Sequence, residues 1–186
     1  MDTLTLLGTA VALGMDAFAV AICVAAGLAR LTARHIFRLS WHFGLFQSLM
    51  TICGWVGGAA LSTFMYGANY WIAFGILSLL GLNMIRQSLH PECCIEGRDP
   101  TRGWSLVGFS VATSIDALAV GVSFSLIGLS IWVPAGVIGL AAILMTFIGM
   151  RIGKQVGTHL GPWAERIGGI VLIAIGGKVL IDYLSR

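Results

Sequence analysis

The sequence predicts an all-α polytopic membrane protein with six transmembrane helices, built as two inverted three-helix repeats. Of the 186 residues, 58% are hydrophobic and 10% are charged, whereas a soluble domain carries roughly 25% charged residues. The apolar residues are spread over the whole chain, which indicates a single membrane domain surrounded by the lipid bilayer. The basic residues are dispersed between apolar spans, so no nucleic-acid partner is expected.

The six spans follow from the uncharged runs, because a spanning helix needs about 20 mostly apolar residues. Residues 39–85 carry no charge, which suits two spans, with Gly67 and Asn69 as turn residues between them. Residues 117–150 are also uncharged, and residues 128–134 break that run. The predicted spans are residues 4–28, 36–61, 70–89, 104–129, 131–153 and 164–184.

The distribution of Lys and Arg predicts the orientation. Nine of the 11 basic residues flank the first, third and fifth connections, and the second and fourth connections have none. The positive-inside rule places that face in the cytoplasm and both termini outside. These nine are Arg30, Arg34, Arg38, Arg86, Arg98, Arg102, Arg151, Lys154 and Arg166.

An internal repeat relates the two halves of the chain. GMDAFAVAI at residues 14–22 matches SIDALAVGV at 114–122, and MTICGWVGG at 50–58 matches MTFIGMRIG at 145–153. Each half holds three spans, and because three is odd, the second half is predicted to be inverted relative to the first. The predicted division is a first repeat at 1–90, a cytoplasmic connection at 91–103 and a second repeat at 104–186. Inverted repeats are a transporter architecture with the substrate site at their interface.

Two aspartates, Asp16 and Asp116, fall near the centres of the first and fourth spans, at equivalent places in the repeat. A charged group at the centre of a bilayer costs at least about 2.5 kcal/mol on insertion scales. Neither span contains a basic residue, so a bound cation is the expected counter-charge. The alternative is that each Asp only holds helices together through hydrogen bonds.

Other polar residues extend this candidate site. Gln47 lies near the middle of the second span, and Thr113 and Ser123 share the helix face of Asp116. Small residues around both aspartates predict that the first and fourth spans approach each other closely. Carboxylate, amide and hydroxyl oxygens form a hard site, which suits Mg²⁺, Ca²⁺ or Mn²⁺. The predicted metal ligands are therefore Asp16, Asp116, Gln47, Thr113 and Ser123.

The same segments carry a family resemblance. GMDAFAV in the first span, ATSIDALAVG in the fourth, the stretch 43–55 and WIAFGILSLLG at 71–81 resemble the MntP family of manganese efflux proteins. The resemblance covers nearly the whole chain and implies Mn²⁺ export from a bacterial cytoplasm, with a fold similar to the lysine-exporter-like transporters. It implies a metal-handling role for Asp16 and Asp116, and for Gln47. One departure is Asn83, where the family often has a basic residue.

These observations predict an exporter of Mn²⁺ or another divalent metal in a bacterial inner membrane, with Mn²⁺ as substrate and no cofactor. Rocking of the two halves would expose the ion outside, and proton return would release it, because metal ligands exchange metal for protons. An exporter of an amino acid or other small cationic solute is the alternative. A second alternative is a scaffold protein that transports nothing. No enzyme is expected, since the G-x-G-D signature of intramembrane aspartyl proteases is absent.

Overall fold

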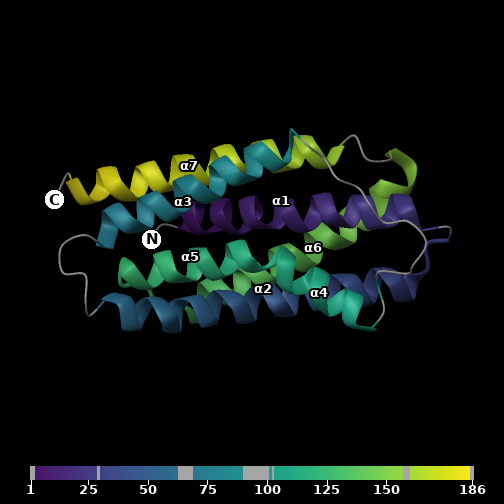
Figure 1. Ribbon diagram of the computed structural model, residues 1–186, viewed down its shortest axis with the longest axis horizontal. Helices are drawn as coiled ribbons and strands as arrows, with labels where there is room; N and C mark the ends of the chain where they lie inside the picture. The colour runs from purple at the N-terminus through teal and green to yellow at the C-terminus, as the bar shows by residue number, and fades with distance from the viewer. Residues whose placement is uncertain are drawn as a thin grey trace.

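The protein is a bundle of helices that run along one long axis (Figure 1). The computed structural model describes residues 3–28, 30–62, 69–89, 101, 103–156 and 160–184, and no strand occurs among them. The helices are α1 (Thr3–Gly27), α2 (Ala33–Ser62), α3 (Asn69–Gln87), α4 (Gly103–Thr113), α5 (Ile115–Leu126), α6 (Trp132–Val156) and α7 (Leu160–Leu184).

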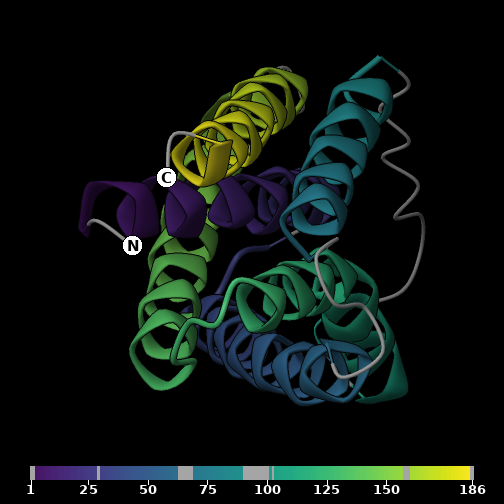
Figure 2. The ribbon, with the colours of Figure 1, turned by 90° about the vertical axis from the view of Figure 1, so that its left-hand side faces the viewer.

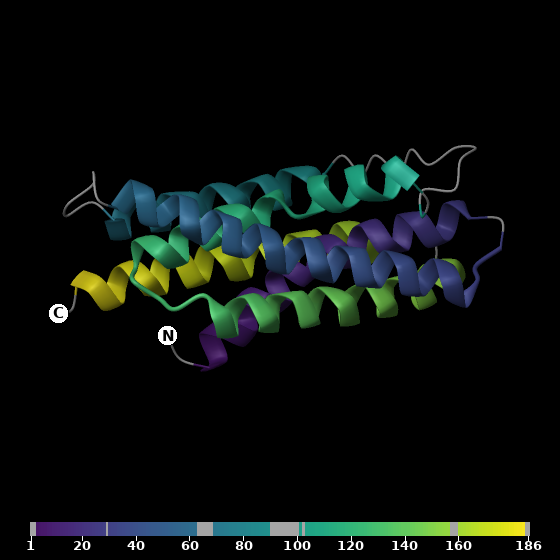
Figure 3. The ribbon, with the colours of Figure 1, turned by 90° about the horizontal axis from the view of Figure 1, so that it is seen from below.

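Successive spans alternate in direction, so the two ends of the chain lie at the same end of the bundle (Figure 1; Figure 3). Among the described residues, five segments are long and apolar enough to cross a membrane by length and composition, counting α4 and α5 as one, and a shorter apolar helix covers Tyr70–Arg86. The predicted all-α polytopic architecture is confirmed. We call the end with the chain termini the terminal end and the opposite one the basic end, because Arg30, Arg34 and Arg151 lie beside the connections there.

The structure corrects the prediction for the fourth span. The sequence predicted one helix over residues 104–129, but the helix is broken at Ser114, which has φ −105° and ψ 5°. The Ser114 backbone N–H donates to the Val111 carbonyl, and its hydroxyl donates to the Ser110 carbonyl at 2.6 Å. A hydroxyl that takes the carbonyl four residues earlier competes with the helical ladder and bends it.

Helices of the two sequence halves interleave. The helix α1 packs along α6 and α7, whereas α5 packs along α2 and α3; α2 also meets α6, and α3 meets α7. Figure 2, viewed from the terminal end, shows α1 passing between the α3 and α7 pair and the helices α2, α5 and α6. These pairings are unchanged when the first three spans are exchanged with the last three, as the predicted repeat requires.

Glycines at matching places of the repeat make matching contacts. A Cβ atom added at Gly54 on α2 would overlap the carbonyl of Leu118, and one added at Gly149 on α6 would lie 2.8 Å from the carbonyl oxygen of Phe18. Gly54 and Gly149 differ by 95 residues, and Phe18 and Leu118 by 100, which are the offsets of the sequence repeat. Small residues let membrane helices approach closely. These contacts support the inverted repeat, which stays a prediction.

The predicted boundaries of the halves at 90, 91–103 and 104 also stay a prediction. Residues 90–100 and 102 lie outside the described residues, as do Arg98 and Arg102 of the predicted basic face. The observed interleaving means that the two halves are divisions of the sequence and not separate packing units.

The α2 helix offers a matched pair of glycines for testing the close packing on α5. We expect Gly54→Ala to lower the free energy of unfolding by about 1–3 kcal/mol, the usual range for overpacking, because its Cβ would meet the Leu118 backbone. No described atom lies within 4 Å of a Cβ at Gly57, so Gly57→Ala should be neutral or stabilising by up to about 1 kcal/mol. Thermal unfolding of both variants in detergent checks this. Equal effects would contradict the close α2 and α5 contact.

Candidate functional site

Two apolar clusters are stacked along the bundle. The cluster nearer the terminal end includes Leu13 of α1, Phe124 of α5 and Ile138 of α6. The cluster nearer the basic end includes Phe43 of α2 and Ala17 of α1. Between them, on four helices, lies a set of buried and half-buried polar residues that we call the polar layer. Its members are Asp16, Gln47, Thr51, Thr113, Ser114 and Asp116.

Gln47 connects α2 to α1 within this layer. Its side chain is fully buried, and its Nε2 donates to the carbonyl oxygen of Leu13 at 3.3 Å. Leu13 lies three residues before Asp16, so the amide contacts α1 within about one helical turn of that aspartate. The Oε1 atom of Gln47 is buried and has no hydrogen-bond partner among the described residues.

Asp116 lies in the first turn of α5, directly after the break. Its Oδ1 accepts a hydrogen bond of 2.7 Å from the Ala117 backbone N–H, which in a continuous helix would donate to the Thr113 carbonyl. The Oδ2 atom is buried and accepts no hydrogen bond from any residue that the structure describes. The helix α4 ends at Thr113, so carbonyl groups at the end of one helix and a carboxylate at the start of the next meet at the break. Helix C-termini attract cations.

Asp16 has a different setting. It is half-buried and lies inside α1, which continues without a break from Thr3 to Gly27. The helix α6 covers α1 there, because a Cβ atom added at Gly14 would lie 2.9 Å from the Cγ of Met145. The two aspartates are thus at equivalent positions of the sequence repeat, but one lies in a continuous helix and the other at a break.

The expected close approach of the first and fourth spans was wrong. The helices α1 and α5 do not pack along each other, and α1 meets α4 only briefly. The helix α2 bridges them instead, through the bond from Gln47 to Leu13 on one side and the contact of Gly54 with Leu118 on the other. The small residues around each aspartate face the second helix of the other half, as Gly14 faces Met145.

The other two predicted ligands differ in their positions. Thr113 is buried at the end of α4, beside the break and three residues before Asp116. Ser123 is also buried, but its hydroxyl donates to the Ala119 carbonyl at 3.1 Å. It lies about 10 Å further along α5 than Asp116. The structure therefore brings Thr113 to the candidate site and does not bring Ser123 there.

Sequence reasoning did not select two threonines as ligands. Thr146 of α6 is fully buried, and its Oγ1 has no hydrogen-bond partner within the described part of the chain. Thr51 of α2 is equally buried, and its hydroxyl donates to the Gln47 carbonyl at 2.6 Å. The shared Met-Thr pair at 50–51 and 145–146 was the available signal, because it places a hydroxyl at the same point of each half.

The side chains of the polar layer favour a cation that is bound by one or two carboxylates together with several neutral oxygen atoms. Within the residues that the structure describes, no group of three or more His, Cys, Asp and Glu side chains is placed to hold a metal. Buried polar atoms are normally hydrogen-bonded, whereas the unpartnered Oδ2 of Asp116 and Oε1 of Gln47 are acceptors that a cation would satisfy. An all-oxygen set of this kind suits Mg²⁺, Ca²⁺ or Mn²⁺.

Comparison with known proteins gives a consistent set of relatives. A family model described as "Putative manganese efflux pump" matches residues 30–180. The chain is 50% identical over 184 residues to a protein of Syntrophotalea carbinolica, covering 98% of both chains. It is 51% identical over 185 residues to one of Desulfotalea psychrophila, covering 98% of this chain and 96% of the relative. Both relatives are named "Putative manganese efflux pump MntP". No solved structure matches the chain.

Because the Oε1 atom of Gln47 has no hydrogen-bond partner among the described residues, the effect of replacing Gln47 on the stability of the metal-free protein can be predicted. We expect Gln47→Leu to change the free energy of unfolding by less than about 1 kcal/mol, because the loss of one hydrogen bond is offset by removal of a buried unsatisfied oxygen. Phe43→Ala, one turn earlier and equally buried, should cost about 3–5 kcal/mol. Thermal unfolding in metal-free detergent compares them. A loss for Gln47→Leu as large as that for Phe43→Ala would mean that the amide serves mainly to hold the helices.

Proposed function

The chain belongs to the MntP family, whose members are described as putative manganese efflux pumps, and from this membership we propose that it exports Mn²⁺ from the cytoplasm. The cation passes through the polar layer, where Asp16, Asp116 and Gln47 provide oxygen ligands and Thr113 contributes from the break. Mn²⁺ is the cargo, and the proposed activity requires neither a chemical step nor a resident cofactor. Other divalent ions of similar hardness are the nearest competitors.

The observation that carries the proposal is the pair of buried, unpartnered acceptors on neighbouring elements. Asp116 Oδ2 and Gln47 Oε1 accept no hydrogen bond from the described residues, and each such group costs about 1–3 kcal/mol when buried. A cation between the two apolar clusters would recover that free energy. A structural role for the same residues would be better served by paired donors and acceptors.

The interleaved packing changes the expected motion. Rocking of the two sequence halves would separate α1 from α6 and α2 from α5, which pack along their lengths. We infer instead two moving groups, α1 with α6 and α2 with α5, which slide against each other where α2 meets α6. The polar layer has members on both groups, Asp16 on the first and Gln47 and Asp116 on the second. Their relative movement would open the site to each side in turn.

The proposed location is a bacterial inner membrane with the basic end in the cytoplasm and both termini outside. The helices support a multi-pass membrane protein, and the concentration of Arg at one end supports the orientation through the positive-inside rule. With this orientation the basic end faces the compartment from which Mn²⁺ is removed.

The transport test uses everted membrane vesicles, in which export appears as uptake. We expect Mn²⁺ uptake with the unsubstituted protein, and a loss of at least about tenfold in Asp116→Asn and in Asp16→Asn, since even indirect changes near metal ligands cost 10–100-fold. Asp182→Asn is the matched control, because Asp182 is an exposed carboxylate on α7 outside the polar layer. Expression is matched by immunoblot.

Two outcomes would contradict the proposal. An equal rate in Asp116→Asn and in the unsubstituted protein would remove Asp116 from the pathway. Absence of uptake for every divalent ion, together with competition-sensitive uptake of lysine, would replace the metal with an organic cation.

Proton coupling is the second transport prediction. Because carboxylate ligands must be deprotonated to bind metal, we expect an inside-acid gradient in everted vesicles to drive Mn²⁺ uptake. A protonophore should then reduce the initial rate to the level of Asp116→Asn vesicles, whereas an ionophore that removes only the membrane potential should have a smaller effect. Uptake that continues unchanged after the proton gradient is collapsed would exclude proton antiport.

A further inference from the structure

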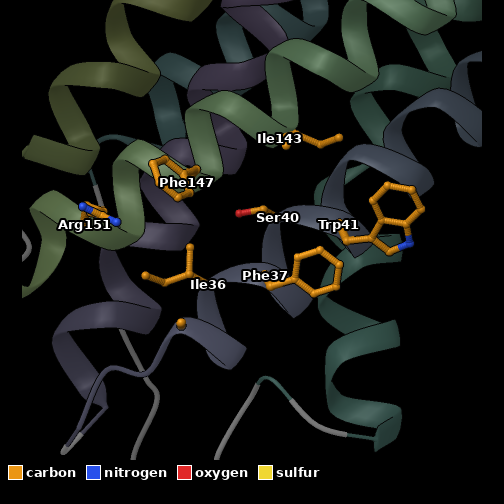
Figure 4. A pocket seen from close by; sticks show the side chains of 8 residues that line it. Ile36, Phe37, Ser40, Trp41, Ile143, Phe147 and Arg151 are labelled. Carbon is orange, nitrogen blue, oxygen red and sulfur yellow. The ribbon is translucent and has the colours of Figure 1, made fainter.

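A cavity of about 210 Å³ lies between α2 and α6 near the basic end. Figure 4 shows Phe37 and Trp41 on the α2 side, and Phe147 and Arg151 on the α6 side. Phe37 is 69% exposed and Phe147 is 42% exposed, so these walls belong to the outer surface of the bundle. In a membrane protein such a surface faces lipid, and the natural occupant of an apolar groove there is a lipid chain.

Ser40 is the unusual polar group of this cavity. Four other buried hydroxyls inside helices donate to the carbonyl four residues earlier; they belong to Thr9, Thr51, Ser110 and Ser123. The Ser40 side chain is 5% exposed, and its Oγ makes no hydrogen bond with any described residue. In Figure 4 this oxygen points into the cavity. A buried donor aimed at an apolar groove indicates a ligand with an oxygen at that depth.

Arg151 provides the charge at one end of the same groove. Its guanidinium lies 5.0 Å from the centre of the Phe147 ring, over the ring face, and the residue is exposed. A guanidinium presents a fork of donors that matches a phosphate group. The groove thus combines an aromatic wall, one buried hydroxyl and a cation at the membrane end where basic residues gather.

The groove continues toward the middle of the bundle. A second cavity of about 290 Å³ shares Trp41 and Ile143 with the first and extends along Gly139 to Gly136. The stretch of α6 from Gly136 to Arg151 is about 22 Å long, whereas half of the hydrocarbon core of a bilayer is about 15 Å. The two cavities together are therefore long enough for one acyl chain to cross its own leaflet.

We propose that this groove binds one anionic phospholipid from the leaflet at the basic end. The phosphate group pairs with Arg151, and an ester or glycerol oxygen accepts a hydrogen bond from the Ser40 hydroxyl. One acyl chain lies along Trp41 and Ile143 and reaches Gly139. The charge of Arg151 selects an anionic head group over a zwitterionic one, because basic pockets between membrane helices on this side attract anionic lipids. The site lies on the outward faces of α2 and α6 and is separate from the polar layer.

The test is a titration of the purified full-length protein in detergent with dioctanoyl phosphatidylglycerol, followed by the midpoint of thermal unfolding. We expect Arg151→Gln to weaken the apparent affinity about fivefold, since one basic residue near the surface contributes about that factor. Dioctanoyl phosphatidylcholine should bind more weakly to the unsubstituted protein, and this variant should weaken its binding less, because the choline cation already offsets the charge of its phosphate. Ser40→Ala should weaken the binding of both lipids.

Arg34→Gln is the matched control, because Arg34 is exposed at the same end of α2 but does not line the cavity. An equal loss of affinity in Arg34→Gln and Arg151→Gln would overturn the proposal in favour of general surface charge. Equal affinity for the two lipids would overturn it as well. A benzophenone-bearing phenylalanine placed at position 37 distinguishes occupants in native membranes: covalent capture of phosphatidylglycerol supports the proposal, and capture of a second copy of this chain overturns it.

Discussion

An oxygen atom buried between apolar clusters must find a donor or a cation, because neither lipid nor a packed core replaces the hydrogen bonds that water would supply. The polar layer concentrates such atoms on Asp116 and Gln47, at the level where the two apolar clusters meet. The carboxylate of Asp116 receives one backbone N–H at the start of α5, which orients one oxygen and leaves the other available. The remaining architecture can be understood as the means of holding these atoms at one level of the bundle.

Interleaving of the sequence halves holds the atoms of the polar layer at one level of the bundle. Because α2 packs against α5 and reaches α1 through Gln47, it joins the neighbourhoods of both aspartates without direct packing of α1 on α5. The close contact depends on glycines such as Gly54, at which a side chain would collide with a neighbouring backbone. In the same way, Gly149 lets α6 approach α1. Movement of one interleaved group against the other would alter the polar layer without breaking these tight contacts.

The helices α2 and α6 have two different faces. Gln47 and Thr146 are fully buried inside the bundle, whereas Trp41 and Phe147 line the outward groove that Ser40 and Arg151 complete. An occupant of the groove would therefore touch the same two helices that border the candidate site. Lipid and cargo would act on opposite faces of one helix pair, which makes the composition of the leaflet relevant to the transport cycle.

The sequence by itself determined the class of fold and the positions of the spans, because crossing a membrane depends on the length of apolar runs. It also marked Asp16 and Asp116 as candidate ligands, since the cost of burying a charge makes each one conspicuous, and that role stays a prediction. It did not reveal the break at Ser114, because Ser110 and Ser123 in the same span make the same hydroxyl-to-carbonyl bond within unbroken helices.

Only the tertiary structure decided which helices pack together. Nearly every face of each span is apolar, so hydropathy gives no preference between partners, and close packing around residues such as Gly54 makes that choice. The tertiary structure also decided which of the predicted ligands lie at the candidate site. Helical spacing gave Thr113 and Ser123 the same face as Asp116, but the hydroxyl of Ser123 bonds to its own helix about 10 Å away. Gln47 reaches α1 because α6 packs against both α1 and α2 and holds them near each other, an arrangement that is set by three-dimensional packing.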